Sequence, residues 1–429
     1  MISIDALYRI YRQFPLVQTD SRKIEKGSLF FALKGEHFNG NQFAPQALEQ
    51  GAAYAVVDEQ PAGGTMSENI ILVDDVLATL QNLAGYHRQQ FDIPFLAITG
   101  SNGKTTTKEL VHAVLSTRFK TYTTEGNLNN HIGIPLTLLR VKPDAEMAVI
   151  EMGANHQKEI EGYCRYTQPT HGIITNAGKA HLEGFGGIAG VRKGKGELFD
   201  FLRSHNGTAF VMWDYDYLRE MSAGISHIVS YGTSDADLAG RVLQSEPFLK
   251  VRISKGMPEQ DITTSLVGSY NLPNVLAAAA VGNYFKVPAD QIKTAIEAYQ
   301  PSNSRSQLIE FHSNKIILDA YNANPSSMKA AIENLVRIPA TKKILLLGGM
   351  AELGEESLEE HRQILELIRQ YPWEEVALVG GDFLKLDHPY HRFENSAQAR
   401  DWFRRQPFRD SYILVKGSRS MKMEKLLEE

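Results

Sequence analysis

The chain has 429 residues, of which 43% are hydrophobic and 22% charged, and its net charge is -5 at pH 7. This composition is that of a folded globular protein of two or three domains, and the scattered basic residues exclude nucleic-acid binding as a main role. No stretch approaches the ~20 apolar residues that cross a bilayer, and the first residues, MISIDALYRIYRQF, lack the apolar core of a signal peptide. We therefore expect a cytoplasmic protein that is not membrane-embedded.

Three stretches of the chain differ in their pattern of apolar runs and turns. Residues 1–92 contain the short β-rich runs SLFFAL, AAYAVVD and NIILVDD between Gly and Asn turns, which predicts a small mixed α/β domain. Residues 93–303 alternate apolar runs, FLAITG, MAVIEMG, HGIITN and AFVM, with helical patterns. Residues 304–429 repeat that alternation with KIILDA, KKILLLGG, EVALVGG and SYILVKG. The alternation predicts two further α/β domains built on parallel sheets, and residues 235–272 add antiparallel strands to the middle one.

The first motif with a chemical meaning follows the run FLAITG. The segment SNGKTTTKEL comes directly after it, and apolar residues then recur at helical spacing, so strand, loop and helix succeed one another. Gly100 and Gly103 let backbone N–H groups surround phosphate oxygens at a helix N-terminus. Lys104 would neutralise the terminal phosphates, and the Thr105 hydroxyl would bind Mg²⁺. A glycine-rich turn with a solvated lysine is the alternative, but the flanking strand and helix favour an ATP-binding loop from Gly100 to Thr106.

Three later side chains are candidates for the remaining chemistry. Glu151 ends the run MAVIE, where an acid near a phosphate loop is placed to bind Mg²⁺; a helix cap or surface acid is the alternative. His181 follows a strand and a short turn, and Lys195 lies fourteen residues later in a predicted helix. Taken alone, His181 is typical of a hydrogen-bonded structural histidine and Lys195 of a solvated helix residue, like its neighbour Lys193.

Several strings, in order, resemble one enzyme family. TGSNGKTTT, GNLNNHIGIPLTLL, IEMGANHQKEI and TNAGKAHLEGFGG…KGKGELF are similar to the ATP-dependent Mur ligases of bacterial cell-wall synthesis. GSYNLPNVLAAAA, LDAYNANPSSMKAAIENL and VKGSRSMKME extend the resemblance over nearly the whole chain. DAYNANPSSM and the early TDSRKIEKGSLFFALKGEHFNGNQFAPQALEQGA resemble the branch of that family that adds D-Ala-D-Ala to a UDP-muramoyl tripeptide.

The resemblance implies a fold and a reaction. The fold is α/β with three domains: a small N-terminal UDP-substrate domain (1–92), a central P-loop ATPase-type parallel-sheet domain (93–303) and a C-terminal Rossmann-like domain (304–429). In the reaction, the terminal carboxylate of the tripeptide attacks the γ-phosphate of ATP, and the amine of D-Ala-D-Ala then displaces phosphate from the acyl phosphate. ATP and Mg²⁺ are the implied cofactors, the substrates are small molecules, and a monomer is expected.

The resemblance also implies roles for individual residues. The catalytic group is Lys104, Glu151, His181, Lys195 and Arg305. The ATP-binding group is Gly100, Ser101, Asn102, Gly103, Lys104, Thr105, Thr106, Asn271, Asn274, Arg305, Asp319, Asn322 and Asn324. The UDP-substrate group is Ser21, Arg22, Asn129 and Asn130. The metal ligands are Thr105, Glu151, His181 and Lys195, the last as a carbamate formed with CO₂.

Each of these roles has a structural alternative. Asn271 and Asn274 could cap the helix that follows, Asn322 and Asn324 could be turn residues before a proline, and Arg305 could be a surface arginine. Two residues depart from the family pattern: His131 stands where an acid is frequent and Ser304 where a glycine is frequent.

The rival functions are a Mur ligase adding diaminopimelate, lysine or D-glutamate, a folylpolyglutamate synthase, and a non-catalytic binding protein. The UDP-type N-terminal domain argues against the folate enzyme, and the string YNANP favours the dipeptide-adding branch over the amino-acid-adding ones. The presence of Lys104, Thr105, Glu151, His181 and Lys195 argues against a non-catalytic protein. The sequence leaves open whether the third residue of the tripeptide is diaminopimelate or lysine.

Overall fold

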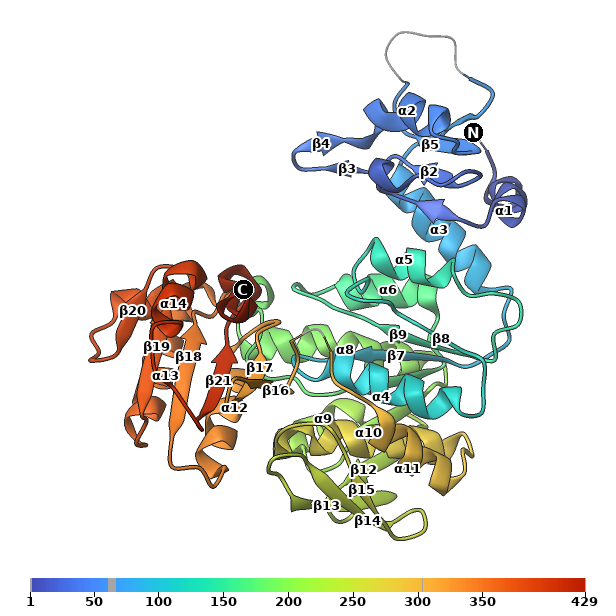
Figure 1. The fold of residues 1–429 in the computed structure, drawn as a ribbon. Helices are drawn as coiled ribbons and strands as arrows, with labels where there is room; N and C mark the ends of the chain where they lie inside the picture. The colour runs from blue at the N-terminus through green and yellow to red at the C-terminus, as the bar shows by residue number, and fades with distance from the viewer. Residues whose placement is uncertain (1, 61–66, 303, 429) are drawn as a thin grey trace. The chain divides into compact units, whose positions relative to one another are not determined.

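The structure is a computed structural model that describes residues 2–60, 67–302 and 304–428 (Figure 1). The chain divides into two compact units. Unit 1 comprises Met1–Ala97, Phe119–Gly153 and Glu159–His171, and unit 2 comprises Ile98–Arg118, Ala154–Lys158 and Gly172–Glu429. Both units alternate strands and helices, which confirms the α/β class predicted from the sequence.

The N-terminal part of unit 1 is a parallel sheet of four strands in the order β1-β2-β5-β6. The strands are β1 (Val17–Gln18), β2 (Leu29–Phe31), β5 (Tyr54–Val57) and β6 (Ile70–Leu72), and the helices are α1 (Ile4–Gln13), α2 (Ala44–Glu49) and α3 (Val76–Arg88). Ala44 and Ala47 of α2 pack on Phe30, whereas α3 lies on the opposite face of the sheet (Figure 1). A small hairpin, β3 (Lys34–Gly35) with β4 (Phe38–Asn39), precedes α2. The three β-rich runs are thus confirmed as strands.

The rest of unit 1 carries strands β7, β9 and β8 in that order, with helices α5 and α6. Their bounds are β7 (Phe95–Thr99), β8 (Thr121–Thr123), β9 (Met147–Glu151), α5 (Gly133–Leu138) and α6 (Glu159–Thr167). Every residue of β7 and β9 is buried, as expected for apolar runs in a sheet that is covered on both faces. β8 and β9 run parallel, so Glu151 sits at the carboxyl end of β9, where α/β sheets bind ligands.

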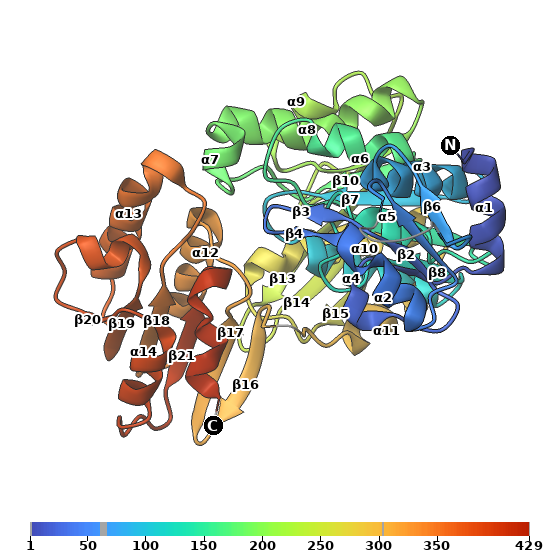
Figure 2. The same ribbon diagram turned by 90° about the horizontal axis from the view of Figure 1, so that it is seen from above.

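Unit 2 contains most of strand β10 and all of strands β11 to β15, which follow one another in that order in the sheet. The strands are β10 (His171–Ile174), β11 (Thr208–Met212), β12 (His227–Gly232), β13 (Leu238–Gln244), β14 (Lys250–Lys255) and β15 (Gln260–Thr263). The pairs β13–β14 and β14–β15 are antiparallel, which confirms the prediction for residues 235–272. Helices α4 (Lys104–Ser116), α10 (Leu272–Tyr284) and α11 (Ala289–Ala298) lie on one side, and α8 (Ile188–Ser204) and α9 (Asp216–Ser222) on the other (Figure 2).

Helix α10 explains how the loop before α4 is supported. Its sequence, LPNVLAAAAVGNY, is apolar around its whole circumference, and a soluble helix of that kind is stable only when it is surrounded. It packs against α4 on one side and against β11, β12 and β13 on the other. The N-terminal turn of α10, with Asn271 and Asn274, is thereby fixed beside the start of α4.

The C-terminal part of unit 2 is a six-stranded sheet in the order β16-β17-β21-β18-β19-β20, in which only the β16–β17 pair is antiparallel. The strands are β16 (Gln307–Phe311), β17 (Asn314–Asp319), β18 (Lys343–Gly348), β19 (Glu375–Val379), β20 (His391–Phe393) and β21 (Tyr412–Lys416). Helices α12 (Pro325–Arg337) and α13 (Ser357–Arg369) cover one face, and α14 (Ser396–Phe403) covers the other (Figure 2). The four predicted runs are confirmed as β17, β18, β19 and β21.

Candidate active site

The loop between β7 and α4 has a backbone that requires glycine at two positions. Gly100 has φ 143° and Gly103 has φ 80°. A Cβ atom on Gly100 would lie 2.0 Å from Thr175 Oγ1, and one on Gly103 would lie 2.6 Å from Asn274 Oδ1. Conformation and space therefore both demand glycine, as predicted for a loop that wraps its N–H groups around an anion.

Two residues directly after β10 hold this loop in place. Thr175 Oγ1 donates to the Asn102 carbonyl oxygen over 2.6 Å, and Asn176 Nδ2 donates to the same oxygen over 3.0 Å. Asn176 Oδ1 accepts the Asn102 N–H over 3.0 Å, and its carbonyl oxygen accepts the Ser101 N–H over 2.9 Å. Thr175 and Asn176 were not predicted from the sequence, although a polar pair directly after an apolar strand is typical of a residue pair that supports a loop.

The cationic and hydroxyl groups predicted for phosphate and Mg²⁺ lie on the first turn of α4. Lys104 is its first residue, and its Nζ donates to the carbonyl oxygens of Gly100 (2.7 Å) and Ser101 (3.3 Å). Thr105 is buried and Thr106 is half-buried. The ammonium, the hydroxyls and the N–H groups of a helix N-terminus thus lie together at one loop, an arrangement that suits an anionic, metal-bound ligand.

Asn271 and Asn274 support the loop through their side chains rather than capping α10. Asn271 occupies the N-cap position, but its amide donates to the Val267 carbonyl oxygen over 2.9 Å and makes no capping bond. Asn274 donates to Asn271 Oδ1 over 2.8 Å and accepts from Thr107 Oγ1 over 3.0 Å. The capping interpretation of these two side chains is therefore wrong.

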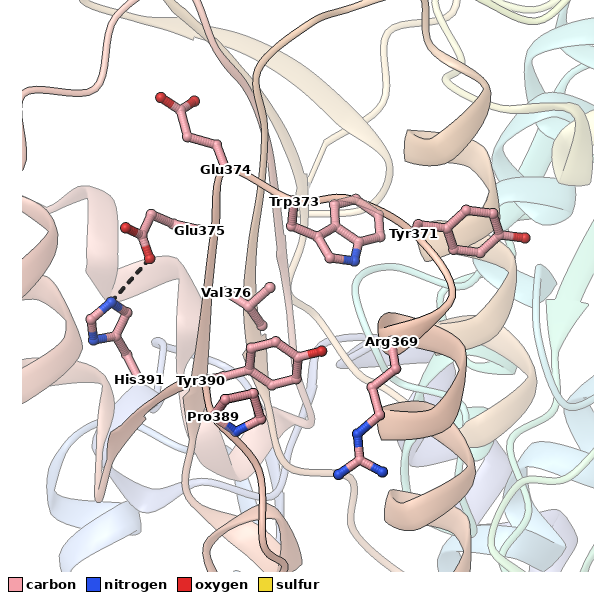
Figure 3. Close-up of a pocket in the computed structure, with 9 residues that line it drawn as sticks. All are labelled: Arg369, Tyr371, Trp373, Glu374, Glu375, Val376, Pro389, Tyr390 and His391. Carbon is pink, nitrogen blue, oxygen red and sulfur yellow. Dashed lines mark hydrogen bonds and ion pairs between the residues drawn. The ribbon is translucent and has the colours of Figure 1, made fainter.

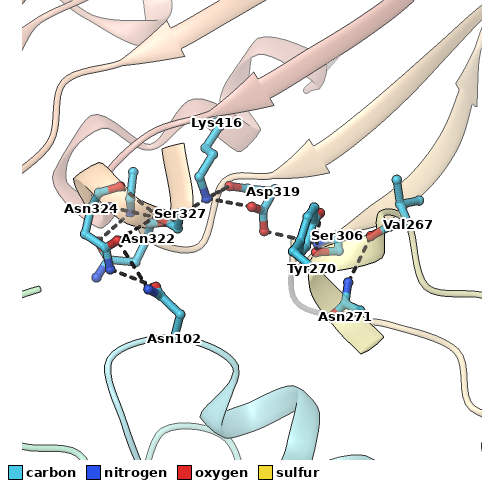
Figure 4. Close-up of polar contacts among 11 residues, drawn as sticks. Asn102, Val267, Tyr270, Asn271, Ser306, Asp319, Asn322, Asn324, Ser327 and Lys416 are labelled. Carbon is cyan, nitrogen blue, oxygen red and sulfur yellow. Dashed lines mark hydrogen bonds and ion pairs between the residues drawn. The ribbon is translucent and has the colours of Figure 1, made fainter. Parts of the chain in front are cut away.

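A second asparagine pair joins the loop to the start of α12 (Figure 4). Asn324 Nδ2 donates to Asn102 Oδ1 over 2.8 Å. Asn324 also caps α12, since its Oδ1 accepts the Ser327 N–H over 2.9 Å while Ser327 Oγ accepts the Asn324 N–H over 3.1 Å. Asn322, in contrast, is exposed, and its Oδ1 accepts the Ala323 N–H over 2.9 Å, as a turn residue does.

The Asp319 carboxylate is fixed at the carboxyl end of β17 by groups from two other segments (Figure 4). Lys416, its register partner at the end of β21, is buried and places Nζ 2.6 Å from Asp319 Oδ2. The Ser306 N–H donates to Asp319 Oδ1 over 3.1 Å, and Ser306 Oγ lies 3.1 Å from the hydroxyl of Tyr270, a residue whose pKa is raised by burial. Lys416 was missed from the sequence, although a lysine that closes a buried apolar run is unusual.

Arg305 is half-buried and stacks on an aromatic ring. Its guanidinium carbon lies 3.6 Å from the centre of the Tyr321 ring, and the guanidinium of Arg419 lies 5.4 Å from the same centre. Ser304, the departure from the family pattern, has φ 55°, a conformation that glycine adopts freely and that costs other residues about 1–2 kcal/mol. The frequent glycine at this position thus has a backbone reason.

His181 and Glu352 form an ion pair in unit 2. His181 precedes α7 (Leu182–Phe185) with φ 52°, and its Nδ1 lies 2.5 Å from Glu352 Oε2. The hydrogen bond from His181 lowers the pKa of the Glu352 carboxyl below its usual range.

Lys195 is buried in α8, which corrects the view of it as a solvated helix residue. Its Nζ donates to the Ala154 carbonyl oxygen over 2.9 Å and lies 4.9 Å from the centre of the Phe185 ring. A Cβ on Gly194 would lie 2.4 Å from that ring, so the glycine lets Phe185 approach. Lys193, two residues before, is exposed, so the two lysines differ in burial.

In unit 1, Glu151 is buried at the end of β9. Its Oε1 accepts a hydrogen bond from Asn129 Nδ2 over 2.7 Å, and its Oε2 has no hydrogen-bond partner among the described residues. Asn130 Oδ1 accepts the Ile132 and Gly133 N–H groups over 3.2 and 2.9 Å, so this side chain shapes the turn before α5. In the described part of the chain, no three His, Cys, Asp or Glu side chains form a metal cluster, so Mg²⁺ would need hydroxyl, phosphate or water oxygens as well.

The N-terminal candidates form a separate group. Ser21 and Arg22 lie in a short 3₁₀ turn, Ser21–Lys23, that Asp20 caps by accepting the Arg22 N–H. The exposed Arg22 guanidinium also makes two bonds of 2.9 Å to the Asp20 carboxylate and lowers its pKa to about 2. Arg22 is thus pre-oriented at the surface of the first sheet.

A cavity of about 280 Å³ lies at the amino-terminal end of β19 (Figure 3). Because β17, β21, β18 and β19 run parallel, Asp319 and Lys416 lie at the opposite end of the sheet. Its aromatic residues are Tyr371, Trp373 and Tyr390. Some of its polar groups are bound within the protein: His391 lies 3.0 Å from Glu375, and Trp373 Nε1 donates to the Ile368 carbonyl oxygen over 2.8 Å. Nothing at this cavity adds to the candidate active site.

Models of known families match almost the whole chain. Residues 98–282 match the Mur ligase middle domain, residues 304–419 the Mur ligase glutamate ligase domain, and residues 14–88 the catalytic domain of the Mur ligase family. The three matches follow the order of the family's N-terminal, middle and C-terminal domains.

Individual relatives agree with these matches. The UDP-N-acetylmuramoyl-tripeptide–D-alanyl-D-alanine ligase of Bacillus subtilis (strain 168) is 34% identical over 424 residues, which cover 96% of this chain and 92% of that protein. The enzyme of the same name from Escherichia coli (strain K12) is 36% identical over 422 residues, with the same coverage. The crystal structure of the MurF ligase of Thermotoga maritima in complex with ADP superposes with a TM-score of 0.87 at 25% identity, covering 100% of this chain and 98% of that one.

Proposed function

Because this chain belongs to the Mur ligase family, we propose that it joins D-Ala-D-Ala to a UDP-N-acetylmuramoyl tripeptide at the cost of ATP. The tripeptide carboxylate attacks the γ-phosphate, which releases ADP and leaves an acyl phosphate. The dipeptide amine then attacks the acyl carbon, phosphate leaves, and the amide forms. A carboxylate is a poor acyl donor because oxide is a poor leaving group, and phosphorylation replaces that leaving group with phosphate.

The observation that carries this proposal is the loop from Gly100 to Thr106, whose two glycines are required by both conformation and space. In this proposal Lys104 binds the β- and γ-phosphates, and the backbone N–H groups at the start of α4 donate to their oxygens. Asn271, Asn274, Asp319, Asn322 and Asn324 form the adenosine side. Arg305 stabilises charge on the transferring phosphoryl group once its guanidinium turns from Tyr321 toward the nucleotide.

Magnesium is the metal that this proposal requires. A buried carboxylate oxygen without a protein partner is costly unless a ligand covers it, so Glu151 Oε2 fits a hard cation. Thr105 and His181 are the further proposed ligands. When bound, Mg²⁺ offsets the negative charge of the phosphates and of the reacting carboxylate.

The fourth proposed ligand is Lys195, as a carbamate. Two of its contacts, with a carbonyl oxygen and with an aromatic face, suit a cation. Carbamylation would therefore require the side chain to leave the Ala154 carbonyl oxygen. The buried position of Lys195 supports a functional group there, and the rescue experiment in the Discussion tests its chemistry.

Ser21, Arg22 and Asn130 are proposed for the UDP-substrate, residues 1–92, 93–303 and 304–429 for the three domains, and a cytoplasmic monomer for the working state. Within the described ranges, no helix combines the length and apolar character that a membrane span needs.

The reaction is tested by measuring phosphate release with ATP, Mg²⁺, UDP-muramoyl tripeptide and D-Ala-D-Ala while one component at a time is omitted. We expect release only with all components present, together with a pentapeptide product by mass spectrometry. Release with a free amino acid in place of the dipeptide would instead assign the chain to an amino-acid-adding branch. Substitution of lysine for diaminopimelate in the tripeptide identifies the preferred third residue.

The Asn102–Asn324 pair gives a second prediction. Asn324→Ala should weaken ATP binding about 2- to 10-fold, since a hydrogen bond is worth about 0.5–1.5 kcal/mol, and should also destabilise α12 through loss of its cap. Ser327→Ala is the matched control, because it removes a capping bond but does not touch Asn102. Calorimetry should show weakened ATP binding in the first variant alone. Equal losses in both variants would mean that the cap, and not the contact with the loop, matters.

A further inference from the structure

The two carboxylate oxygens of Glu151 have different surroundings, and this difference indicates a role for Asn129. Glu151 is 1% exposed, so water cannot solvate the carboxylate and offset the cost of burying it. Its backbone N–H donates to Thr124 Oγ1 over 3.0 Å, which fixes the end of β9. Of its two carboxylate oxygens, Oε1 is bound at 2.7 Å by Asn129, and Oε2 has no hydrogen-bond partner within the described residues.

Asn129 is itself fixed by contacts that aim its amide at Glu151. Its carbonyl oxygen accepts the Gly153 N–H over 2.7 Å, and its own N–H donates to the Asn127 carbonyl oxygen over 2.8 Å. A Cβ atom on Gly153 would lie 2.9 Å from Asn129 Oδ1, so the absence of a side chain at residue 153 leaves the room that the amide occupies. Because a carboxylate only accepts hydrogen bonds, the NH₂ group must face Glu151.

We propose that Asn129 is a positioning residue for Glu151 rather than a contact for the UDP-substrate. It holds Oε1 and thereby turns Oε2 toward the metal. The inference rests on the proposed function, in which Glu151 binds Mg²⁺. Groups that orient a metal ligand in this way typically change metal affinity by 10–100-fold when they are removed.

The test uses the full-length protein and Mn²⁺ alone, whose free-ion electron paramagnetic resonance signal reports the unbound fraction. The binding that Glu151→Gln removes defines the site. We expect Asn129→Ala to weaken that binding by about 10–100-fold and to raise the Mg²⁺ concentration needed for half-maximal turnover, with KM for the UDP-substrate unchanged. Asn127→Ala is the matched control, since this exposed amide lies in the same loop and the backbone bond to Asn129 is retained.

Gly153→Ala provides a second variant in case Asn129→Ala does not fold. Its new methyl group would displace the Asn129 amide without deleting any polar group, so the same loss of Mn²⁺ affinity is expected. Unchanged Mn²⁺ binding with a raised KM for the UDP-substrate would overturn the inference and restore the role as a substrate contact. Wild-type protein that lacks Mn²⁺ binding dependent on Glu151 would overturn the metal assignment as well, while the component-omission assay would still decide whether the ligase reaction occurs.

Discussion

Lys104→Ala should reduce kcat by at least about 10²–10³-fold, the loss that follows removal of one preorganised group that stabilises transition-state charge. The Lys104 ammonium is the cation that the structure places in the loop itself, bound to the Gly100 and Ser101 carbonyl oxygens. Without it, charge that develops on the transferring phosphoryl group has no counterpart there. Phosphate release under saturating substrates measures the effect.

Binding of the UDP-substrate should survive the same change. The residues proposed for that substrate belong to unit 1, whereas Lys104 belongs to unit 2. Titration calorimetry should therefore give a dissociation constant near that of the wild type. Lys255→Ala, which removes an exposed lysine at the end of β14, is the control for loss of positive charge. A parallel loss of substrate binding and turnover would contradict separate sites.

Lys195→Ala should also abolish most activity, and a short carboxylic acid such as acetate should restore part of it. The truncation leaves space in a buried position, and a small carboxylate can occupy the place of a carbamate. Turnover against acetate concentration is the measurement, and it should rise to a plateau. Lys193→Ala, two residues away on the exposed face of α8, should retain activity and show no response to acetate.

An absence of restoration, with Mn²⁺ binding equal to that of the wild type, would remove the carbamate from the mechanism. Lys195 would then act as the cation that its present contacts suit. Restoration by methylammonium in place of acetate would support the same conclusion.

Strands and the phosphate loop could be predicted because their signals are local. Buried parallel strands such as β7 and β9 are short continuous apolar runs, which are typical of few other elements. The order of strand, loop and helix then indicated that the glycine-rich loop binds phosphate. The role of the glycines at residues 100 and 103 could be predicted from the same local pattern.

The contacts around the loop could not be predicted from the same signals. Asn102 meets Asn324 across 222 residues of sequence, and Lys416 meets Asp319 across 97. Such pairs depend on which strands become neighbours, and the periodicity of a single sequence does not specify strand order. Asn129 shows how this affects the prediction of function. The resemblance implied that Asn129 contacts the substrate, whereas in the structure its amide donates to Glu151.

The double role of Asn324 limits which residues can replace it. Serine, threonine, aspartate and asparagine all start helices well, because each offers an oxygen to a backbone N–H. Only asparagine among them also carries an NH₂ group, the donor that meets Asn102. Aspartate would keep the helix start but set a negative charge beside a loop built for phosphates. Helix capping alone would therefore accept any of four amino acids at residue 324, whereas the contact with Asn102 accepts only asparagine. Sequence change at the start of α12 is thus limited by the nucleotide-binding loop, which lies far away in the sequence.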